Sequence, residues 1–264
     1  MKKWNFSFFI ISIMSIILIS STAFAITISN SYGTPTINGK NYNFTSEVWD
    51  RYGPTVEAVA NVKSEDGNVP AGYMGGQARL YNTSGILKAS TAMQYNDVSS
   101  SGLYVYSSRI RDTGTYYAQS KAAFYTGNGY NSYTGFKSPN LSIVSAKSAS
   151  TTTNSEVIND LMLQTVYAKN SNGETYGSAI SEYTIGVEPD LINAVGTNGV
   201  EGYVRADDLN PNVSSIAEAI KLTGKSGSNR KITLYDADGT TVLGKFDLIS
   251  NYELVTGTES NELQ

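Results

Sequence analysis

The stretch Gly114-Thr-Tyr-Tyr-Ala-Gln-Ser-Lys-Ala-Ala-Phe-Tyr125 alternates between two sets of side chains along its whole length. Because successive side chains of a strand point to opposite faces, Tyr116, Ala118, Ser120, Ala122 and Phe124 share one face. The other face carries more polar and bulkier groups, at Tyr117, Gln119, Lys121, Ala123 and Tyr125. Turn-forming residues lie on both sides, at 112–114 and 127–129. The pattern predicts one half-buried antiparallel strand at the centre of a sheet.

Short alternating runs of the same kind fill the chain around this strand. They are separated by turn sequences such as Asn38-Gly39, a dipeptide typical of tight hairpins. Seven or eight such runs within about 110 residues are typical of a β-sandwich or an open barrel. We predict a mainly β protein whose residues 26–145 form an antiparallel β-sandwich rich in tyrosine.

The second half has a different pattern. Residues 146–155 are small and polar, which is typical of a linker. Residues 156–250 are expected to form a small α+β module, and 251–264 a flexible tail. Within the module the sequence predicts helices at 156–168, after Glu188-Pro189-Asp190, and after the capping box Ser215 to Glu218. A hairpin is expected around residues 237–239.

The first 25 residues have the three parts of a secretory signal peptide. Lys2 and Lys3 precede an apolar run from Phe6 to Ile19, and the segment ends in Ala23-Phe24-Ala25. We expect cleavage after Ala25 and a secreted, extracellular protein that has no stable insertion in the membrane. Cleavage removes two of the 19 basic residues and none of the 23 acidic ones, so the net charge becomes −6. Such an acidic chain lacks the basic surface that nucleic acids require.

The amino-acid composition limits the kinds of catalytic and metal-binding sites that the chain can form. The chain has no histidine and no cysteine, which excludes histidine-dependent triads, cysteine nucleophiles, histidine or cysteine zinc sites, haem and iron–sulfur clusters. The lack of cysteine in a secreted chain favours a Gram-positive bacterium over a eukaryotic secretory route. We therefore predict a protein without a catalytic site, a cofactor or a metal ion.

Two kinds of site stay open to a chain of this composition. A carboxylate-based hydrolase of cell-wall polymer needs only two acidic groups, for which the available residues are Glu57, Asp97, Asp112, Glu188 and Glu201. The sequence Asp236-Ala-Asp-Gly239 begins like a calcium loop but lacks the later acidic ligands, so a plain hairpin turn is the favoured interpretation.

One part of the second half resembles a known kind of sequence. The runs Asn172-Gly-Glu-Thr-Tyr-Gly-Ser-Ala179, Glu188-Pro-Asp-Leu-Ile192 and Gly196-Thr-Asn-Gly-Val-Glu-Gly-Tyr-Val-Arg205, followed by Asp208-Leu209, resemble a segment of uncharacterised secreted or surface proteins of Gram-positive bacteria of the Firmicutes type. The resemblance covers residues 172–248 and implies an extracytoplasmic protein. Some proteins with such segments are grouped with membrane metallopeptidases, whose HExxH zinc motif this chain cannot form. The N-terminal part resembles no family that we can name.

Tyrosine is the residue type that most suggests a binding site. Tyr125, Tyr130, Tyr133 and Phe136 cluster around the glycine-rich loop at 127–129, and tyrosine combines an apolar ring with a polar tip suited to sugars and protein interfaces. Packing between neighbouring strands is the alternative explanation for these rings. The prediction is a non-enzymatic binding or structural protein of the cell envelope or exterior, whose partner is a cell-wall glycan or an envelope protein. The alternatives are the carboxylate-based hydrolase and a secreted effector or immunity-type protein.

Overall fold

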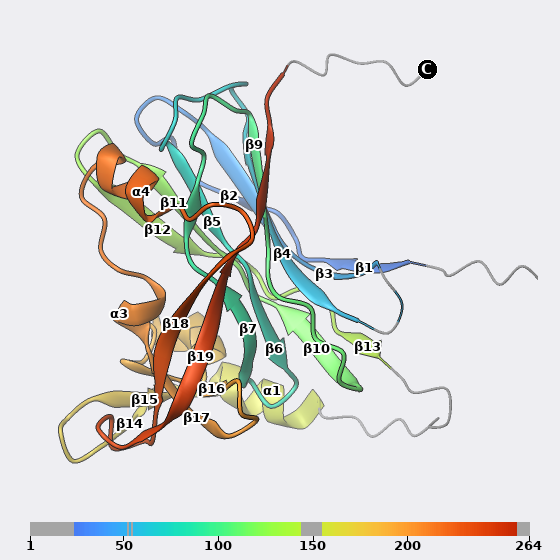
Figure 1. The fold of residues 1–264 in the computed structure, drawn as a ribbon, viewed down its shortest axis with the longest axis vertical. Coiled ribbons are helices and arrows are strands. Elements are labelled where there is room, and N and C mark those ends of the chain that lie inside the picture. The colour runs from blue at the N-terminus through green and yellow to red at the C-terminus, as the bar shows by residue number, and fades with distance from the viewer. Residues whose placement is uncertain (1–23, 52, 54, 144–154, 258–264) are drawn as a thin grey trace, which may run out of the picture.

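The chain is built mainly from β-strands, as its alternating pattern predicts. The computed structural model describes residues 24–51, 53, 55–143 and 155–257, and its strands form three sheets (Figure 1). The predicted signal peptide lies outside these residues except for its last two positions, and the predicted linker except for Ser155.

The first sheet has six strands, all antiparallel. It comprises β1 (Ala25–Ile28), β3 (Tyr42–Asp50), β4 (Glu57–Ser64), β9 (Gly102–Tyr106) and β20 (Tyr252–Val255), with β2 (Tyr32–Gly33) paired to β3. A sheet of four strands contains β12 (Tyr130–Thr134), β11 (Lys121–Tyr125), β5 (Met74–Gln77) and β8 (Gln94–Tyr95).

The third sheet has ten strands and joins the two halves of the chain. In order these are β13 (Leu141–Ile143), β10 (Gly114–Ala118), β6 (Arg79–Asn82), β7 (Leu87–Thr91), β19 (Val242–Ser250), β18 (Ser228–Tyr235), β17 (Glu201–Arg205), β16 (Leu191–Val195), β15 (Thr175–Gly177) and β14 (Ala168–Lys169). An added pairing of β7 with β16 closes the strands from β7 to β16 into a small barrel.

The helices are short. They are α1 (Ser155–Leu163), a 3₁₀ turn (Ala179–Ser181), α2 (Glu182–Ile185), α3 (Ala206–Leu209) and α4 (Ile216–Leu222). Within the described ranges, no helix has the length and apolar character that a bilayer span requires.

A hydrophobic core lies between the six-stranded sheet and the strands β5, β6, β10 and β11. The rings of Tyr42 and Phe124 stack in it with centroids 4.3 Å apart. Tyr116, Ala118 and Ala122 belong to the same core, which confirms the face that their period-two spacing predicts.

The stretch 114–125 differs from the prediction in two ways. It forms two strands in different sheets, β10 and β11, because the ladder is interrupted at Gln119 and Ser120. The amide of Ser120 donates to the Ser46 hydroxyl (2.8 Å) instead of continuing a ladder. Its second face is buried as well: Tyr117 belongs to a second core, formed with the barrel of the C-terminal half. The prediction of a single half-buried strand was therefore wrong.

The C-terminal half also differs from its prediction in part. The hairpin of β18 and β19 around residues 237–239 and the helix after Ser215 are confirmed. The helix expected after Glu188 is wrong, since Leu191–Val195 is strand β16, whose Leu191, Ile192 and Ala194 side chains are fully buried. Residues 252–255, in the expected flexible tail, form strand β20 against β9.

Candidate functional site

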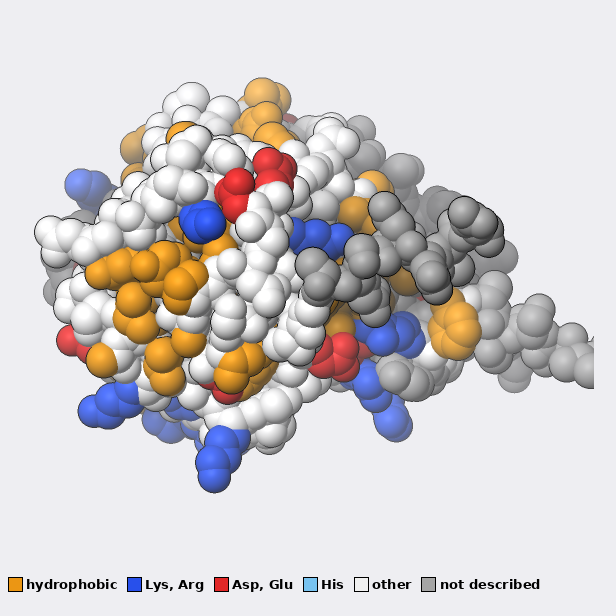
Figure 2. Space-filling model, turned by 90° about the horizontal axis from the view of Figure 1, so that it is seen from above, with side chains coloured by type: hydrophobic (Ala, Val, Ile, Leu, Met, Phe, Trp, Pro, Cys, Tyr) orange, Lys and Arg blue, Asp and Glu red, His pale blue; other side chains and the backbone are white. Residues whose placement is uncertain are grey.

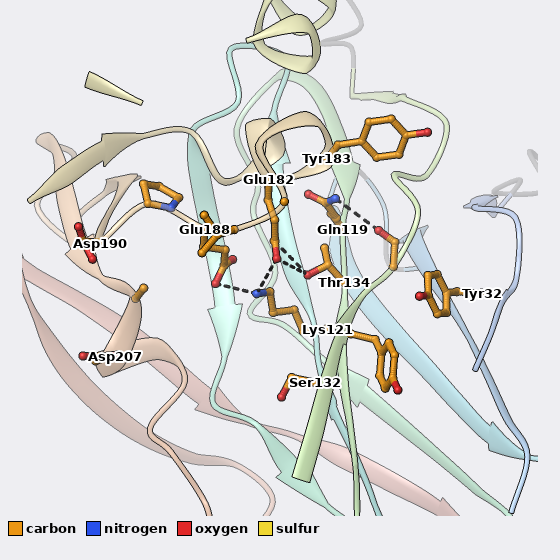
Figure 3. Close-up of a pocket in the computed structure, with 16 residues that line it drawn as sticks. Tyr32, Gln119, Lys121, Ser132, Thr134, Glu182, Tyr183, Glu188, Asp190 and Asp207 are labelled. Atoms are coloured by element: carbon orange, nitrogen blue, oxygen red, sulfur yellow. Dashed lines mark hydrogen bonds and ion pairs between the residues drawn. The ribbon is translucent and has the colours of Figure 1, made fainter. Parts of the chain in front are cut away.

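A groove of about 640 Å³ lies where the C-terminal half meets the hairpin of β11 and β12 (Figure 3). Lys121 on β11 and Thr134 on β12 line it from the N-terminal half, together with Tyr32 on β2. Glu182 on α2 and Glu188 in the following loop line it from the C-terminal half. The groove is thus formed by residues far apart in the sequence.

Lys121 joins the two glutamates at the floor of the groove. Its Nζ lies 2.7 Å from Oε2 of Glu188 and 3.5 Å from Oε1 of Glu182 (Figure 3). Both oxygens of Glu182 also accept from the Thr134 hydroxyl at 3.0 Å. Because all three charged side chains are less than one-fifth exposed, these bonds hold them in fixed positions.

Arg79 supports this network from behind. It is one of the largest fully buried side chains described, and its Nη1 donates to Oε1 of Glu188. Its Nε donates to Oε1 of Gln77 at 2.8 Å. A buried guanidinium requires a carboxylate partner, and Glu188 is that partner.

The two glutamates differ in pKa because their surroundings differ. Burial raises the pKa of Glu182 above its ordinary value, and the attraction of Lys121 only partly offsets this. Burial acts in the same direction on Glu188, but the charges of Arg79 and Lys121 outweigh it and hold the pKa of Glu188 below its ordinary value. Glu188 is therefore the firmly ionised member of the pair.

The loop that carries Glu188 is shaped by its local sequence. Helix α2 ends at Gly186, whose φ of 86° is readily adopted by glycine and whose amide donates to the Glu182 carbonyl. Four residues later, the Asp190 carboxylate accepts from both the amide and the hydroxyl of Thr175 at 2.7 Å. These contacts fix the loop at both ends and direct Glu188 towards Arg79.

Aromatic rings form the opposite side of the groove. Tyr32 and Tyr133 line it with ring centroids 5.8 Å apart, and Tyr32 also lies 5.2 Å from Phe44 and 5.5 Å from Phe136. Tyr183 on α2, which is 63% exposed, stands at the rim. The groove thus combines an apolar, aromatic side with a charged, hydrogen-bonding side.

The structure separates the four aromatic residues that the sequence places in one cluster. Tyr133 lies in the groove and Phe136 beside it. Tyr125 and Tyr130 lie at the other end of the β11–β12 hairpin, with ring centroids 5.5 Å apart. Tyr130 packs on Tyr95 and donates its hydroxyl to the Gly72 carbonyl at 2.6 Å, so its contacts are structural.

Of the acidic residues available for a hydrolase, the structure places Glu188 alone in this groove. Glu57 pairs with Arg51 and Arg109, and Asp97 accepts from the Tyr252 hydroxyl. Asp112 lies near Lys88, and Glu201 is exposed on β17. The second acid of the groove, Glu182, is not among the residues that the sequence suggested.

The loop 236–239 is the turn of a hairpin. Asp238 accepts from the amides of Thr240 and Thr241 at 2.8 Å, and its hydrogen bonds with Thr241 lower its pKa to about 2. Within the part of the chain that the structure describes, no group of three or more candidate ligand side chains is arranged to hold a metal ion.

A second aromatic group lies on the outer face of the six-stranded sheet. The ring of Trp49 is 5.8 Å from that of Tyr106 and 6.5 Å from that of Tyr104. The guanidinium of Arg51 sits 3.6 Å from the centroid of the Trp49 ring. A cation of the chain itself therefore occupies one face of the Trp49 ring.

The sequence does not reveal the charged floor of the groove, because the residues that form it come from both halves of the chain. A partial signal existed in the sequence: Lys121 falls on the more polar face of 114–125, and Arg79 is a cation between Gln77 and Tyr81 in an alternating run. Buried cations in these positions would require acidic partners, but nothing in the local sequence names Glu182 and Glu188.

Comparison with known proteins gives no match, whether to a protein-family model, a curated protein or a solved structure.

Proposed function

We propose that this chain is a secreted, non-enzymatic binding protein of the bacterial cell envelope, and that its groove binds a cell-wall glycan. The observation that carries the proposal is the placement of Tyr32 and Tyr133 on one side of the groove, opposite Lys121, Glu182 and Thr134. Sugar rings present apolar faces to aromatic rings and hydroxyl groups to fixed polar partners.

The charge of the groove favours a ligand without acidic groups. Among the described side chains that line it, Glu182, Glu188, Asp190 and Asp207 are acidic, and Lys121 is basic. On the face of the molecule in Figure 2, basic side chains are scattered and not gathered into a patch. Both features argue against a nucleic acid as the partner.

The proposed extracellular location of the protein is argued from its sequence. The features of a signal peptide at 1–25 and the resemblance of residues 172–248 to Gram-positive surface proteins support an extracellular site of action. The packing of the six-stranded sheet on β5 and β11 supports our interpretation of 26–145 as a β-sandwich, followed by a smaller α+β module. Strand β7 also pairs with β16 and β19, so the module is built directly onto the sandwich.

Retention on purified Gram-positive cell walls tests the proposal. Residues 26–264 are compared with a Tyr133→Ala variant, and with Tyr125→Ala as a matched control. Both tyrosines are half-buried, lie on the same hairpin and contact two other rings, but Tyr133 alone of the two lines the groove.

We expect the wild type and Tyr125→Ala to be retained and Tyr133→Ala to be lost, with all three folded by circular dichroism. Equal retention of the three proteins, or retention of none, would contradict glycan binding in the groove.

The glutamate pair favours a second candidate, a carboxylate-based hydrolase. One acid with a raised pKa beside one with a lowered pKa is the arrangement of a general acid and a nucleophile. Against this, Lys121 lies between the two carboxylates, and both oxygens of Glu188 are engaged by basic side chains. Release of new sugar ends from the walls, abolished by Glu182→Gln, would favour the hydrolase over the binding protein.

A further inference from the structure

The groove continues beyond helix α3. A second hollow of about 370 Å³ is lined by Asn172, Glu174 and Arg205, and it shares Asp190, Ala206 and Asp207 with the groove. The two hollows therefore adjoin along one edge of α3. A ligand longer than one sugar ring would extend from one into the other.

The second hollow differs in chemistry from the first, because its described lining contains no aromatic side chain. Nη1 of Arg205 lies 2.6 Å from Oε1 of Glu174, and its Nη2 donates to the Gly239 carbonyl at 2.7 Å. Oε2 of Glu174 accepts from the Asn170 amide at 2.9 Å. These bonds fix donors and acceptors at the edge of the hollow, where Arg205 is about one-third exposed.

We propose that the two hollows are subsites for one unbranched, uncharged polysaccharide, with one sugar unit against Tyr32 and Tyr133 and a further unit beside Arg205. This inference rests on the proposed function and adds to it the form of the ligand. A single sugar fills the aromatic subsite. An oligomer also makes the polar contacts of the second subsite, and because its units are linked, it loses the entropy of association only once.

The charges select against acidic polymers. Over both hollows, the described lining side chains include the acids Glu174, Glu182, Glu188, Asp190 and Asp207 and the bases Lys121 and Arg205. An anionic polysaccharide would meet a net negative surface along its whole path. A polymer of N-acetylglucosamine, which is neutral and linear, meets no such repulsion.

Titration calorimetry with N-acetylglucosamine as the single sugar and with its β-1,4-linked six-unit oligomer tests the inference. We expect the six-unit oligomer to bind about tenfold more tightly than the single sugar, because it alone reaches the second subsite. The variant Asn172→Arg places a long cationic side chain in the second hollow alone, because Asn172 lines that hollow and not the groove. It should bring the affinity for the six-unit oligomer down to that for the single sugar and leave binding of the single sugar unchanged.

The matched control is Ser171→Arg, which introduces the same side chain one residue earlier in the same turn. Ser171 is exposed and lines neither hollow. Equal affinity for both lengths in the wild type would refute the two-subsite inference and leave glycan binding at the aromatic subsite standing. Equal loss in both arginine variants would also refute it, and binding of neither the single sugar nor the oligomer would overturn the inference together with the proposed function.

Discussion

Replacing Glu188 by glutamine should destabilise the protein far more than the same change at Glu182. Glu188 is the carboxylate partner of Arg79, whose side chain is 1% exposed, and it also binds Lys121 at 2.7 Å. Removing one partner of a buried ion pair typically costs about 3–5 kcal/mol. Because the glutamine amide keeps one oxygen as an acceptor, we expect Glu188→Gln to cost about 3 kcal/mol.

The expectation for Glu182→Gln is a change within about 1 kcal/mol, because the raised pKa of Glu182 shows that its surroundings already disfavour the charge. Glutamine still accepts from Thr134, and Lys121 still has Glu188. Urea unfolding at pH 7, followed by circular dichroism, measures both values. A cost below about 1 kcal/mol for Glu188→Gln, or similar costs for the two variants, would refute this description of the buried network.

Three further predictions concern pH, a helix cap and the C-terminal strand. Because the pKa of Glu188 is lowered in the folded protein, its charge stabilises the fold above its ordinary pKa, and this stabilisation is lost as pH falls. The difference in unfolding free energy between wild type and Glu188→Gln should therefore shrink below pH 4.5. The pKa of Glu182 is raised in the folded protein, so its contribution to the unfolding free energy is present below pH 4.5 and is lost as pH rises. In a pH series of urea titrations, the unfolding free energy of wild type relative to Glu182→Gln should therefore fall as pH rises, opposite to the trend for Glu188. Ser215→Ala should cost about 1 kcal/mol in the same assay, because the Ser215 hydroxyl accepts from the Glu218 amide at the start of α4, whereas a cost near zero would contradict the cap. Ending the chain at Ser250 should cost more than about 2 kcal/mol, because Tyr252 and Leu254 of β20 pack on the first core, and unchanged stability would contradict that packing.

Period-two alternation predicts which side chains share a face but not what covers that face. The alternation in 114–125 correctly places Tyr116 and Phe124 in the first core. It could not show that Tyr117 and Lys121 face the C-terminal half, because that contact depends on residues about 60 positions later, such as Glu182. The break between β10 and β11 at Ser120 likewise involves the distant hydroxyl of Ser46, which accepts from the Ser120 amide.

In strand β16 the free energy of burying apolar side chains outweighs the local signals for a helix start. An acidic residue near a helix start contributes about 0.3–1 kcal/mol, whereas burying a leucine or isoleucine side chain contributes about 1.5–3 kcal/mol. Leu191 and Ile192 are fully buried in the barrel, so packing determines the local structure. The site follows the same rule: Tyr133 could be named from the sequence, but the charged floor opposite it exists only after the two halves pack together.

Chemical-shift mapping tests the central claim most directly, because it locates a ligand without assuming a site. The amide spectrum of residues 26–264 is recorded with and without the six-unit N-acetylglucosamine oligomer. We predict the largest changes at Ser132, Tyr133 and Thr134 and around Asp207, with little change at Tyr125. Changes gathered instead around Trp49, Tyr104 and Tyr106 on the outer face of the six-stranded sheet, or no changes, would contradict the account.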